Sequence, residues 1–486
     1  MSDRVSAPCP RLAIGALRGS SGKTVLAMGL IQAWTAQGRI VAPFKKGPDY
    51  IDAAWLTRAG GRACRNIDTY LMGEEVILRS VGEHARAADV TVIEGNHGLY
   101  DGLGAGAAAS TAEVAKLVRA PLVLLADCTK TTRTVAAMIL GCRHMDPGLA
   151  IAGVVLNQVA TARQEAAIRA AVEQVTGLPV VGCIPRLPDL RLPERHLGLL
   201  TPAEHPEAQS PIRLARQAVE AHVDLDAVWS LAQRAAPLQW VPEAPAAAPN
   251  GIRVGVIRDR AFTFYYPENL EALERLGARL VEVSALTAPA LPPLDALYIG
   301  GGYPETHAAA LAANAGFRAS LRAAIEAGLP VVAECGGLIY LSDAMLLDGA
   351  AHPLVGIFPV TFELGRRPWG HGYTALTVEG ANPFFPAGAA LRGHEFRYSS
   401  VKEMRADALR LAFRMQRGRG FDGERDGLVY KNVLASFTHF HALSAPDWAG
   451  ALMREARRHH GRQARAAAEP AAAATPPAAG VPGGRA

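Results

Sequence analysis

The chain has 486 residues, of which 50% are hydrophobic and 20% are charged, and its formal net charge is +5. This length exceeds one ordinary domain, so two or three domains are expected, and the small net charge gives no support for nucleic-acid binding. The six cysteines form no C-x-x-C pair, which argues against a zinc site or a disulfide framework, and neither a membrane-length apolar run nor a signal-peptide core is present, so a soluble, cytoplasmic protein is predicted.

The first predicted element is a strand at 12–14 that leads into a Gly/Ser loop and then into a helix. The small residues of such a loop let backbone N–H groups turn towards a phosphate, and the helix N-terminus attracts the same anion. Lys23 can reach the β- and γ-phosphates of ATP, and Thr24 can hold magnesium. The first glycine of the common pattern is replaced by Leu17, so a chance Gly-rich turn is the alternative. The predicted phosphate-binding loop residues are Gly19, Ser20, Ser21 and Gly22.

Up to about Arg186, short apolar runs alternate with segments of helical length, which predicts a parallel sheet covered by helices on both faces. The predicted strands lie at 12–14, 40–44, 90–94, 121–127, 150–157 and 179–184. In such a sheet, ligands bind at the carboxyl ends of the strands. A site is therefore predicted along that edge.

Polar side chains follow these strands at that edge. They are Lys45, Lys46, Asp49 and Asp52 after the second strand, Glu94, His97 and Asp101 after the third, and Asp127 and Asn157 at the ends of two later strands. Glu94 is placed to reach a magnesium ion held by Thr24. Alternatively, Glu94 is a solvated cap, the aspartates are turn formers and the lysines are a solvated pair. The phosphate-binding loop upstream favours the functional interpretation.

The second half of the chain repeats an α/β pattern after an Ala/Pro-rich stretch. Strands are predicted at 252–257, 280–283, 296–299 and 330–333, and the Ala, Pro, Gly and Arg composition from about Gln463 predicts a disordered tail. The predicted boundaries are an N-terminal extension at 1–10, a first domain at 11–230, a linker at 231–250, a second domain at 251–460 and the tail at 461–486.

The second domain carries the pattern of a thiol acyl-transfer site. Its strand at 330–333 breaks at Cys335 into a Gly-Gly turn, where a thiol is exposed and a helix N-terminus favours the thiolate. His439 ends a late segment, ASFTHFH, that also contains His441. A buried structural cysteine is the alternative, but a Cys and a distant His are the minimum for this chemistry. The predicted backbone donors to an oxyanion are Gly301, Gly302 and Gly336.

Eight motifs in order carry a family resemblance, from Leu12 to Trp448: GSSGKT, FKKGPDYID, RNID, IEGNHGLYDG, LPERHLG, RDRAFTFYYPENLE, GGGYPE and AECGGLIYLS. Together they resemble the cobyrinic acid a,c-diamide synthases, which are glutamine-dependent enzymes of cobalamin biosynthesis. The resemblance implies an α/β fold with two doubly wound domains. One is an N-terminal P-loop parallel sheet similar to dethiobiotin synthetase, and the other is a C-terminal sheet like that of class I glutamine amidotransferases.

The resemblance also implies an activity. The first domain would use ATP and Mg²⁺ to phosphorylate a carboxylate, and ammonia taken from L-glutamine by the second domain would convert the acyl phosphate into an amide. The expected substrate is a tetrapyrrole, foremost cobyrinic acid at its a and c acetates. Sirohaem, another metallo-tetrapyrrole or hydrogenobyrinate are alternatives, as is a P-loop regulatory ATPase with an inactive amidotransferase module. A homodimer is left open, and neither nucleic acid nor membrane is an expected partner.

Residue roles follow from the resemblance. Phosphates and metal would be handled by Lys23, Thr24 and Glu94, with Asn157 at the nucleotide, and the acyl-phosphate step and substrate placement by Lys45, Asp49, Tyr50, Asp52 and Asp101. Arg195 and His196 would gather substrate carboxylates, or be structural. Cys335 would form the glutamyl thioester and His439 would activate it. His441 falls where many amidotransferases carry the triad Glu, so the third triad member is unassigned. Lys46, Trp55, Asn96 and His97 depart from common family sequences near the expected substrate pocket, which leaves the macrocycle open.

Overall fold

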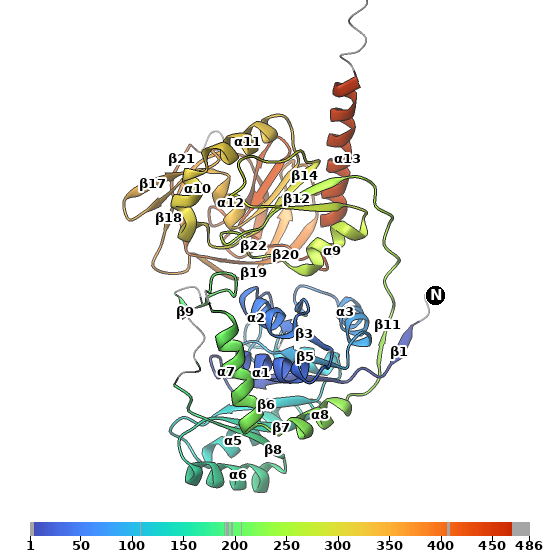
Figure 1. Cartoon of the computed structure of the whole chain (residues 1–486), viewed down its shortest axis with the longest axis vertical. Coiled ribbons are helices and arrows are strands. Elements are labelled where there is room, and N and C mark those ends of the chain that lie inside the picture. The colour runs from blue at the N-terminus through green and yellow to red at the C-terminus, as the bar shows by residue number, and fades with distance from the viewer. Residues whose placement is uncertain are drawn as a thin grey trace, which may run out of the picture.

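The computed structural model describes residues 4–106, 108–188, 190, 194–195, 198–205, 207–405 and 409–468. Over these residues the chain forms two α/β domains stacked along the long axis of the molecule, with the N-terminal domain in the lower half of Figure 1. The predicted α/β fold with two domains is confirmed. None of the described helices is long and apolar enough to cross a membrane.

The N-terminal domain is built on a seven-stranded, fully parallel sheet of order β4-β3-β5-β2-β6-β7-β8. Its strands are almost entirely buried, as near-continuous apolar runs predict. All six predicted strands are present, and the short β4 is the one that was not predicted. The strands are β2 (Arg11–Ala16), β3 (Val41–Lys46), β4 (Arg65–Ile67), β5 (Val90–Glu94), β6 (Leu122–Asp127), β7 (Ile151–Val159) and β8 (Val180–Pro185).

Helices cover both faces of this sheet and form two separate hydrophobic cores. One face carries α1 (Lys23–Ala36), α2 (Ile51–Gly60), α7 (Gln209–His222) and α8 (Leu225–Gln233). The other carries α3 (Glu74–Arg86), α4 (Thr111–Leu117), α5 (Thr134–Met145) and α6 (Ala162–Thr176). Because both faces are filled, the carboxyl-end edge is where this domain offers polar groups to a ligand.

The connection between the domains is more ordered than its Ala/Pro-rich composition suggests. Strand β11 (Leu238–Trp240) pairs antiparallel with β1 (Val5–Ala7), so the predicted linker and N-terminal extension form one small sheet. The buried Arg11 guanidinium donates to the Ala236 carbonyl at 2.7 Å. The chain is therefore fixed to the N-terminal domain as far as Trp240.

The C-terminal domain contains a nine-stranded sheet of order β13-β12-β14-β15-β24-β23-β22-β19-β20. The first five strands are parallel and the remaining pairings are antiparallel. The four predicted strands are confirmed, whereas the antiparallel extension was not predicted. These strands are β12 (Arg253–Ile257), β13 (Arg279–Val283), β14 (Ala296–Ile299), β15 (Val331–Glu334), β19 (Gly370–Val378), β20 (Ala390–Arg397), β22 (Leu411–Arg417), β23 (Arg425–Tyr430) and β24 (Val433–Ser436).

A second sheet and short helices complete this domain. The sheet has the order β17-β16-β18-β21, with β16 (Ser342–Leu347), β17 (Ala350–Pro353), β18 (Phe358–Leu364) and β21 (Ser399–Met404). The helices are α9 (Pro267–Arg275), η1 (Pro304–His307), α10 (Ala308–Ala313), α11 (Ala315–Glu326), α12 (Gly336–Tyr340) and α13 (Asp447–Ala468). Helix α13 continues past the predicted boundary at residue 460, because Ala and Arg favour helix. The rest of the predicted tail, 469–486, lies outside the described residues.

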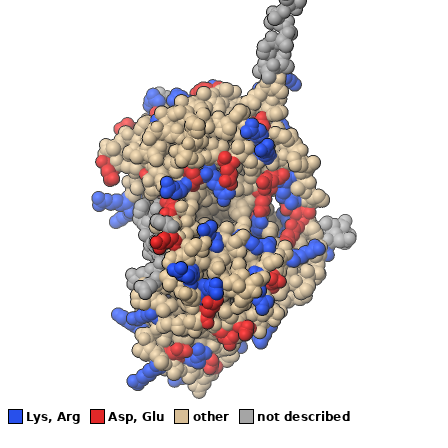
Figure 2. Space-filling view, in the orientation of Figure 1, with Lys and Arg blue, Asp and Glu red and all other residues tan. Residues whose placement is uncertain are grey.

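The two domains meet through charged and aromatic side chains. Arg65 donates two hydrogen bonds to Glu271, at 2.8 and 2.7 Å. Tyr373 donates to Asp68 at 2.6 Å, and the buried Lys46 ammonium donates to the Tyr373 hydroxyl at 3.3 Å. Figure 2 shows that the surface is hollowed between the two domains on this face, with basic and acidic side chains around the hollow. The carboxyl-end edge of the N-terminal sheet thus faces the C-terminal domain.

Candidate functional site

The predicted phosphate-binding loop joins β2 to α1 and depends on a glycine at its last position. Gly22 has a φ of 94°, and a Cβ there would lie 2.7 Å from Nδ2 of Asn157. The same amide donates to the Ser21 carbonyl at 2.7 Å, so Asn157 anchors the loop. Its predicted contact with the nucleotide stays a prediction. The loop ends at the first turn of α1, where unpaired N–H groups suit an anion.

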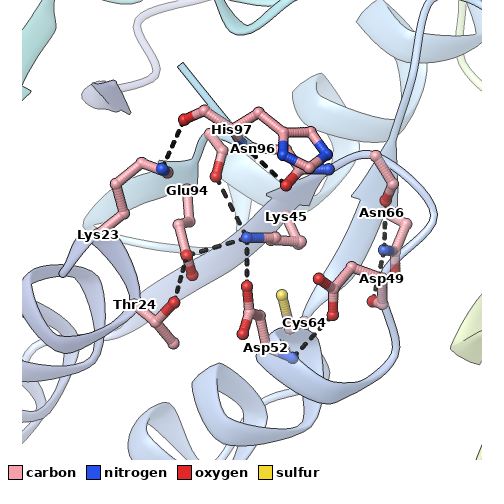
Figure 3. A network of polar contacts seen from close by, with 12 residues as sticks. Lys23, Thr24, Lys45, Asp49, Asp52, Cys64, Asn66, Glu94, Asn96 and His97 are labelled. Atoms are coloured by element: carbon pink, nitrogen blue, oxygen red, sulfur yellow. Dashed lines mark hydrogen bonds and ion pairs between the residues drawn. The ribbon is translucent and has the colours of Figure 1, made fainter. Parts of the chain in front are cut away.

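Next to the loop, the polar groups expected at a nucleotide site cluster around a buried carboxylate (Figure 3). Glu94, which is 0% exposed, accepts from Thr24 Oγ1 at 2.7 Å and from Lys45 Nζ at 2.9 Å, both through Oε1. Lys45 also donates to Asp52 at 2.6 Å. Lys23 donates to the His97 carbonyl at 2.6 Å. The structure thus brings Lys23, Thr24, Lys45, Asp52 and Glu94 together.

The oxygens of this cluster fit magnesium. The second carboxylate oxygen of Glu94, Oε2, is buried and has no hydrogen-bond partner, and the Thr24 hydroxyl lies beside the same carboxylate. Magnesium prefers oxygen ligands and usually takes one or two from the protein, the rest being phosphate and water. No set of three or more His, Cys, Asp or Glu side chains suited to a metal occurs in the described part of the chain.

Burial and neighbouring charges set the protonation of these groups. Burial together with the Lys45 charge lowers the pKa of Lys23 to about 8. Burial alone would lower the pKa of Lys45, but the carboxylates of Asp52 and Glu94 outweigh it and hold that pKa above its ordinary value. Burial and the adjacent Asp52 raise the pKa of Asp49 to about 7. A carboxylate with such a pKa can accept a proton at neutral pH.

Asp49 and Asp101 lie near the lysines of this cluster. Asp49 Oδ1 accepts from the Asp52 backbone at 2.8 Å, which fixes the first turn of α2, and Asp101 accepts from the Gly98 backbone at 2.8 Å. Arg195 lies in strand β9 (Glu194–Arg195), whereas His196 is outside the described residues. The predicted contact of these two residues with substrate carboxylates therefore stays a prediction.

The second predicted site is built on a strained turn between β15 and α12. Cys335 has φ 49° and ψ −100°, a conformation that non-glycine residues rarely adopt and that marks functional turns. It was predicted to be exposed, but it is only 6% exposed. The reason is that β20 covers it, with the Phe396 carbonyl 3.8 Å from the thiol sulfur.

His439 reaches this turn because β24, which precedes it, pairs parallel with β15. The imidazole is 2% exposed, lies close enough to Cys335 for the thiol to raise its pKa, and has Nδ1 3.6 Å from Glu334 Oε2. Burial alone would lower its pKa, but Cys335 and Glu334 outweigh burial and raise the pKa of His439 to about 9. The predicted Cys–His pair is therefore assembled.

The structure also offers an acid for the unassigned third triad position. Glu334 is fully buried and accepts from the Tyr298 hydroxyl at 2.9 Å and from the Phe440 backbone at 3.2 Å, so its carboxylate is held towards His439. His441 instead lies 3.6 Å from Glu268. The only sequence signal for Glu334 was its place directly before Cys335.

The predicted oxyanion glycines lie around the same pair. A Cβ on Gly301 would lie 2.6 Å from His439 Cε1, and a Cβ on Gly336 would lie 3.1 Å from the backbone nitrogen of Gly302. Any larger residue would therefore press on the imidazole or on the donors. Backbone N–H groups in such positions can stabilise a tetrahedral oxyanion.

A P-loop with a buried carboxylate and lysine cluster, together with a Cys–His pair on a strand-to-helix turn, defines the class of glutamine-dependent amide synthases. Residues 12–200 match the family described as CobQ/CobB/MinD/ParA nucleotide binding domain, and residues 253–447 match the CobB/CobQ-like glutamine amidotransferase domain.

Full-length relatives narrow the class. A cobyrinate a,c-diamide synthase of Magnetococcus marinus is 42% identical over 92% of this chain and 97% of its own, and one of Archaeoglobus fulgidus is 38% identical over 92% and 97%. Another, of Methanothermobacter thermautotrophicus, is 38% identical over 92% and 99%. The chain belongs to the cobyrinate a,c-diamide synthase family. It is an enzyme, a glutamine-hydrolysing carbon–nitrogen ligase that uses ATP.

The raised pKa of His439 predicts how glutamine hydrolysis depends on pH. In the roles predicted for the pair, the protonated ring would stabilise the Cys335 thiolate and supply the proton that leaving ammonia needs. The protonated form of His439 is lost as pH rises through about 9. The ring also faces Glu334, Tyr50 and the stacked His394. Burial and the charge of His439 hold the pKa of His394 well below its ordinary value. The rate of glutamate release is therefore expected to fall above about pH 9.

A Glu334→Gln variant is the matched control for this profile. The amide keeps the shape but removes the charge that raises the His439 pKa, so the alkaline fall is expected at lower pH. An alkaline limb at the same pH in both proteins would contradict the assignment of Glu334 as the acid paired with His439.

Proposed function

We propose that the protein amidates the a and c acetate carboxylates of cobyrinate, using ATP and Mg²⁺ to activate each carboxylate and glutamine as the nitrogen source. One observation carries this proposal. The first turn of α2 carries Asp52, which pairs with Lys45, and it is preceded by Tyr50, whose hydroxyl lies 3.3 Å from Nδ1 of His439 across the domain junction. Ammonia released at one site therefore has the other site as its neighbour, and free ammonia need not be drawn from solution, where it is mostly protonated.

At the thiol site, the Cys335 sulfur attacks the carboxamide carbon of glutamine, and the oxygen that becomes negative faces the backbone of Gly301, Gly302 and Gly336. His439 gives a proton to the departing nitrogen, so ammonia leaves and a glutamyl thioester forms. Water then hydrolyses the thioester, which returns the thiol and releases glutamate. Glu334 holds the imidazole in the required orientation through Nδ1.

At the synthetase site, an oxygen of the substrate carboxylate attacks the γ-phosphorus of ATP and ADP leaves, which gives an acyl phosphate. Lys23 and Lys45 lie where they can offset phosphate charge. Magnesium, held by Thr24 and Glu94, would supply further charge stabilisation when bound. Ammonia then displaces phosphate from the acyl carbon, and Asp49, with its pKa near 7, is suited to accept the proton that ammonia loses.

The macrocycle is tested directly by product analysis. The purified protein is incubated with ATP, Mg²⁺, glutamine and one of cobyrinate, hydrogenobyrinate, sirohaem or nickel-sirohydrochlorin, and products are measured by mass spectrometry. We expect two successive replacements of a carboxylic OH by NH₂ on cobyrinate. Amidation of sirohaem or nickel-sirohydrochlorin without amidation of cobyrinate would replace the proposed substrate.

Sirohaem or nickel-sirohydrochlorin as the substrate is favoured by the positions near the synthetase site that depart from common family sequences. Lys46 places a buried ammonium 3.4 Å from Asp68 at the domain junction, and the His97 carbonyl accepts from Lys23. A different set of macrocycle carboxylates could meet these groups. A cytoplasmic location, the absence of nucleic-acid and membrane partners, and the homodimer that was left open stay predictions.

A further inference from the structure

Tyr50 is a residue of the synthetase domain that contacts the catalytic histidine of the other domain. It immediately precedes α2, between Asp49 and Asp52. Its hydroxyl lies 3.3 Å from Nδ1 of His439, and its ring stacks on Phe264 with 5.0 Å between centroids and 5° between planes. The position of the tyrosine is thus set by both domains.

The first turn of α2 is held in an aromatic cluster over the thiol site. Tyr50 and Ile51 pack there against the buried Phe264 and Tyr303 of the C-terminal domain, as do Phe396 and Tyr398 of the same domain. Phe396 is also the residue whose carbonyl lies against the Cys335 sulfur. A shift of this turn would therefore change the packing of Phe396 against the Cys335 sulfur.

Tyr50 competes with Glu334 for one nitrogen. Nδ1 of His439 lies 3.3 Å from the Tyr50 hydroxyl and 3.6 Å from Glu334 Oε2. Nδ1 carries at most one proton, so a short hydrogen bond to one oxygen weakens the bond to the other. A carboxylate partner makes the imidazole more basic than a neutral hydroxyl does. The partner that holds Nδ1 therefore sets how readily His439 takes the Cys335 proton.

A continuous set of polar contacts leads from the phosphate-binding loop to the first turn of α2, which this tyrosine precedes. Thr24 contacts Glu94 at 2.7 Å, Glu94 contacts Lys45 at 2.9 Å, and Lys45 contacts Asp52 at 2.6 Å in the first turn of α2. A nucleotide and its metal would contact Thr24, Glu94 and Lys45, so their binding would change the hydrogen bonds among these side chains. The Lys45–Asp52 bond is the one that reaches the turn preceded by Tyr50.

We propose that Tyr50 is a positioning residue of the thiol site that weakens the bond between His439 and Glu334 until the synthetase site is filled. In the empty enzyme the hydroxyl shares Nδ1 with Glu334 and slows glutamine hydrolysis. Filling the synthetase site moves the first turn of α2 and with it the Tyr50 hydroxyl. Nδ1 of His439 then bonds to Glu334 alone. This regulation rests on the proposed function only for the identity of the macrocycle.

The test is glutamine hydrolysis by the full chain with Tyr50→Phe, which keeps the aromatic stack and removes the hydroxyl. With glutamine alone, kcat for glutamate release is expected to rise roughly fivefold or more, with KM for glutamine unchanged. Addition of ATP, Mg²⁺ and cobyrinate, which should stimulate the wild type, is expected to add little. The alkaline limb of the pH profile should move to higher pH, because His439 then pairs with Glu334.

Two further variants separate this role from a structural one. Tyr70→Phe removes another hydroxyl that crosses the domain boundary, to the Thr374 carbonyl at 3.2 Å, and should leave basal hydrolysis as in the wild type. Combining Tyr50→Phe with Glu334→Gln should cancel the gain, since the gain is expected to act through that carboxylate. The thermal unfolding midpoint of each variant, compared with the wild type, checks that it is folded.

An unchanged or lower basal rate in Tyr50→Phe, an equal gain in Tyr70→Phe, or a gain that survives Glu334→Gln would overturn the proposal. Basal hydrolysis requires neither ATP nor a macrocycle. If the wild type amidates no cobyrinate, the proposed substrate fails, while the basal rates of the variants still decide the role of Tyr50.

Discussion

Replacing Cys335 with serine is expected to lower glutamine hydrolysis by roughly 10³-fold or more, since the thiolate is the nucleophile and a hydroxyl ionises far less readily. The side chain remains in its strained turn, at φ 49°, next to His439, so the loss reflects chemistry and not folding. Glutamine-dependent amidation should fall with it. Amidation driven by ammonium chloride should persist, because the groups around Lys45 and Glu94 are untouched.

The measurement compares glutamate release with amide formation from each nitrogen source. Cys142→Ser is the matched control, because Cys142 lies in α5, is partly buried and belongs to neither site. That variant should behave as the wild type in every assay. If ammonium chloride failed to restore amidation in Cys335→Ser, a synthetase site that works separately from the thiol site would be contradicted.

The elements that could be predicted from sequence are those whose burial is complete. Strands such as β5 and β14 occupy the residues that their apolar runs marked, because a parallel sheet covered on both faces leaves no polar alternation. The antiparallel strands β19 to β23 were not predicted. Several of them alternate between buried and exposed residues and are long and partly polar, so their pattern competes with that of loops and helices.

The same distinction applies to the sites. The loop at Gly19–Thr24 and the Cys335 turn are local, since one strand, one turn and one helix N-terminus position each of them. Contacts between residues that are far apart in the chain have no such local sequence pattern. Glu334 becomes a partner of His439 only because β15 pairs with β24, and Tyr50 reaches the imidazole only because the two domains are stacked. The sequence motifs included both Tyr50 and Glu334, but they did not indicate that both side chains lie at Nδ1 of His439.

Replacing Glu94 with glutamine is expected to lower ATP-dependent amidation by roughly 10²-fold or more, with either nitrogen source. The variant keeps the shape of the side chain, but it removes a charge from a fully buried position between Thr24 and Lys45. The Lys45 ammonium then keeps Asp52 as its carboxylate partner, and the oxygen suited to magnesium, Oε2, is replaced or loses its charge. Amide formation at saturating ATP and the ATP concentration dependence measure the effect.

Glutamine hydrolysis separates the two sites in this variant. Basal hydrolysis should be partly retained, because Cys335, His439 and Glu334 are unchanged, whereas its stimulation by ATP and substrate should be lost, because Glu94 lies between Thr24 and the Lys45–Asp52 bond that leads to Tyr50. Glu75→Gln, at a side chain 79% exposed and paired with Arg4, is the control for removing one carboxylate from the same domain. Equal loss of amidation and basal hydrolysis in Glu94→Gln would mean that the carboxylate supports the whole fold. Loss of amidation and stimulation alone would mean that Glu94 acts on nitrogen release only through the occupancy of its own site.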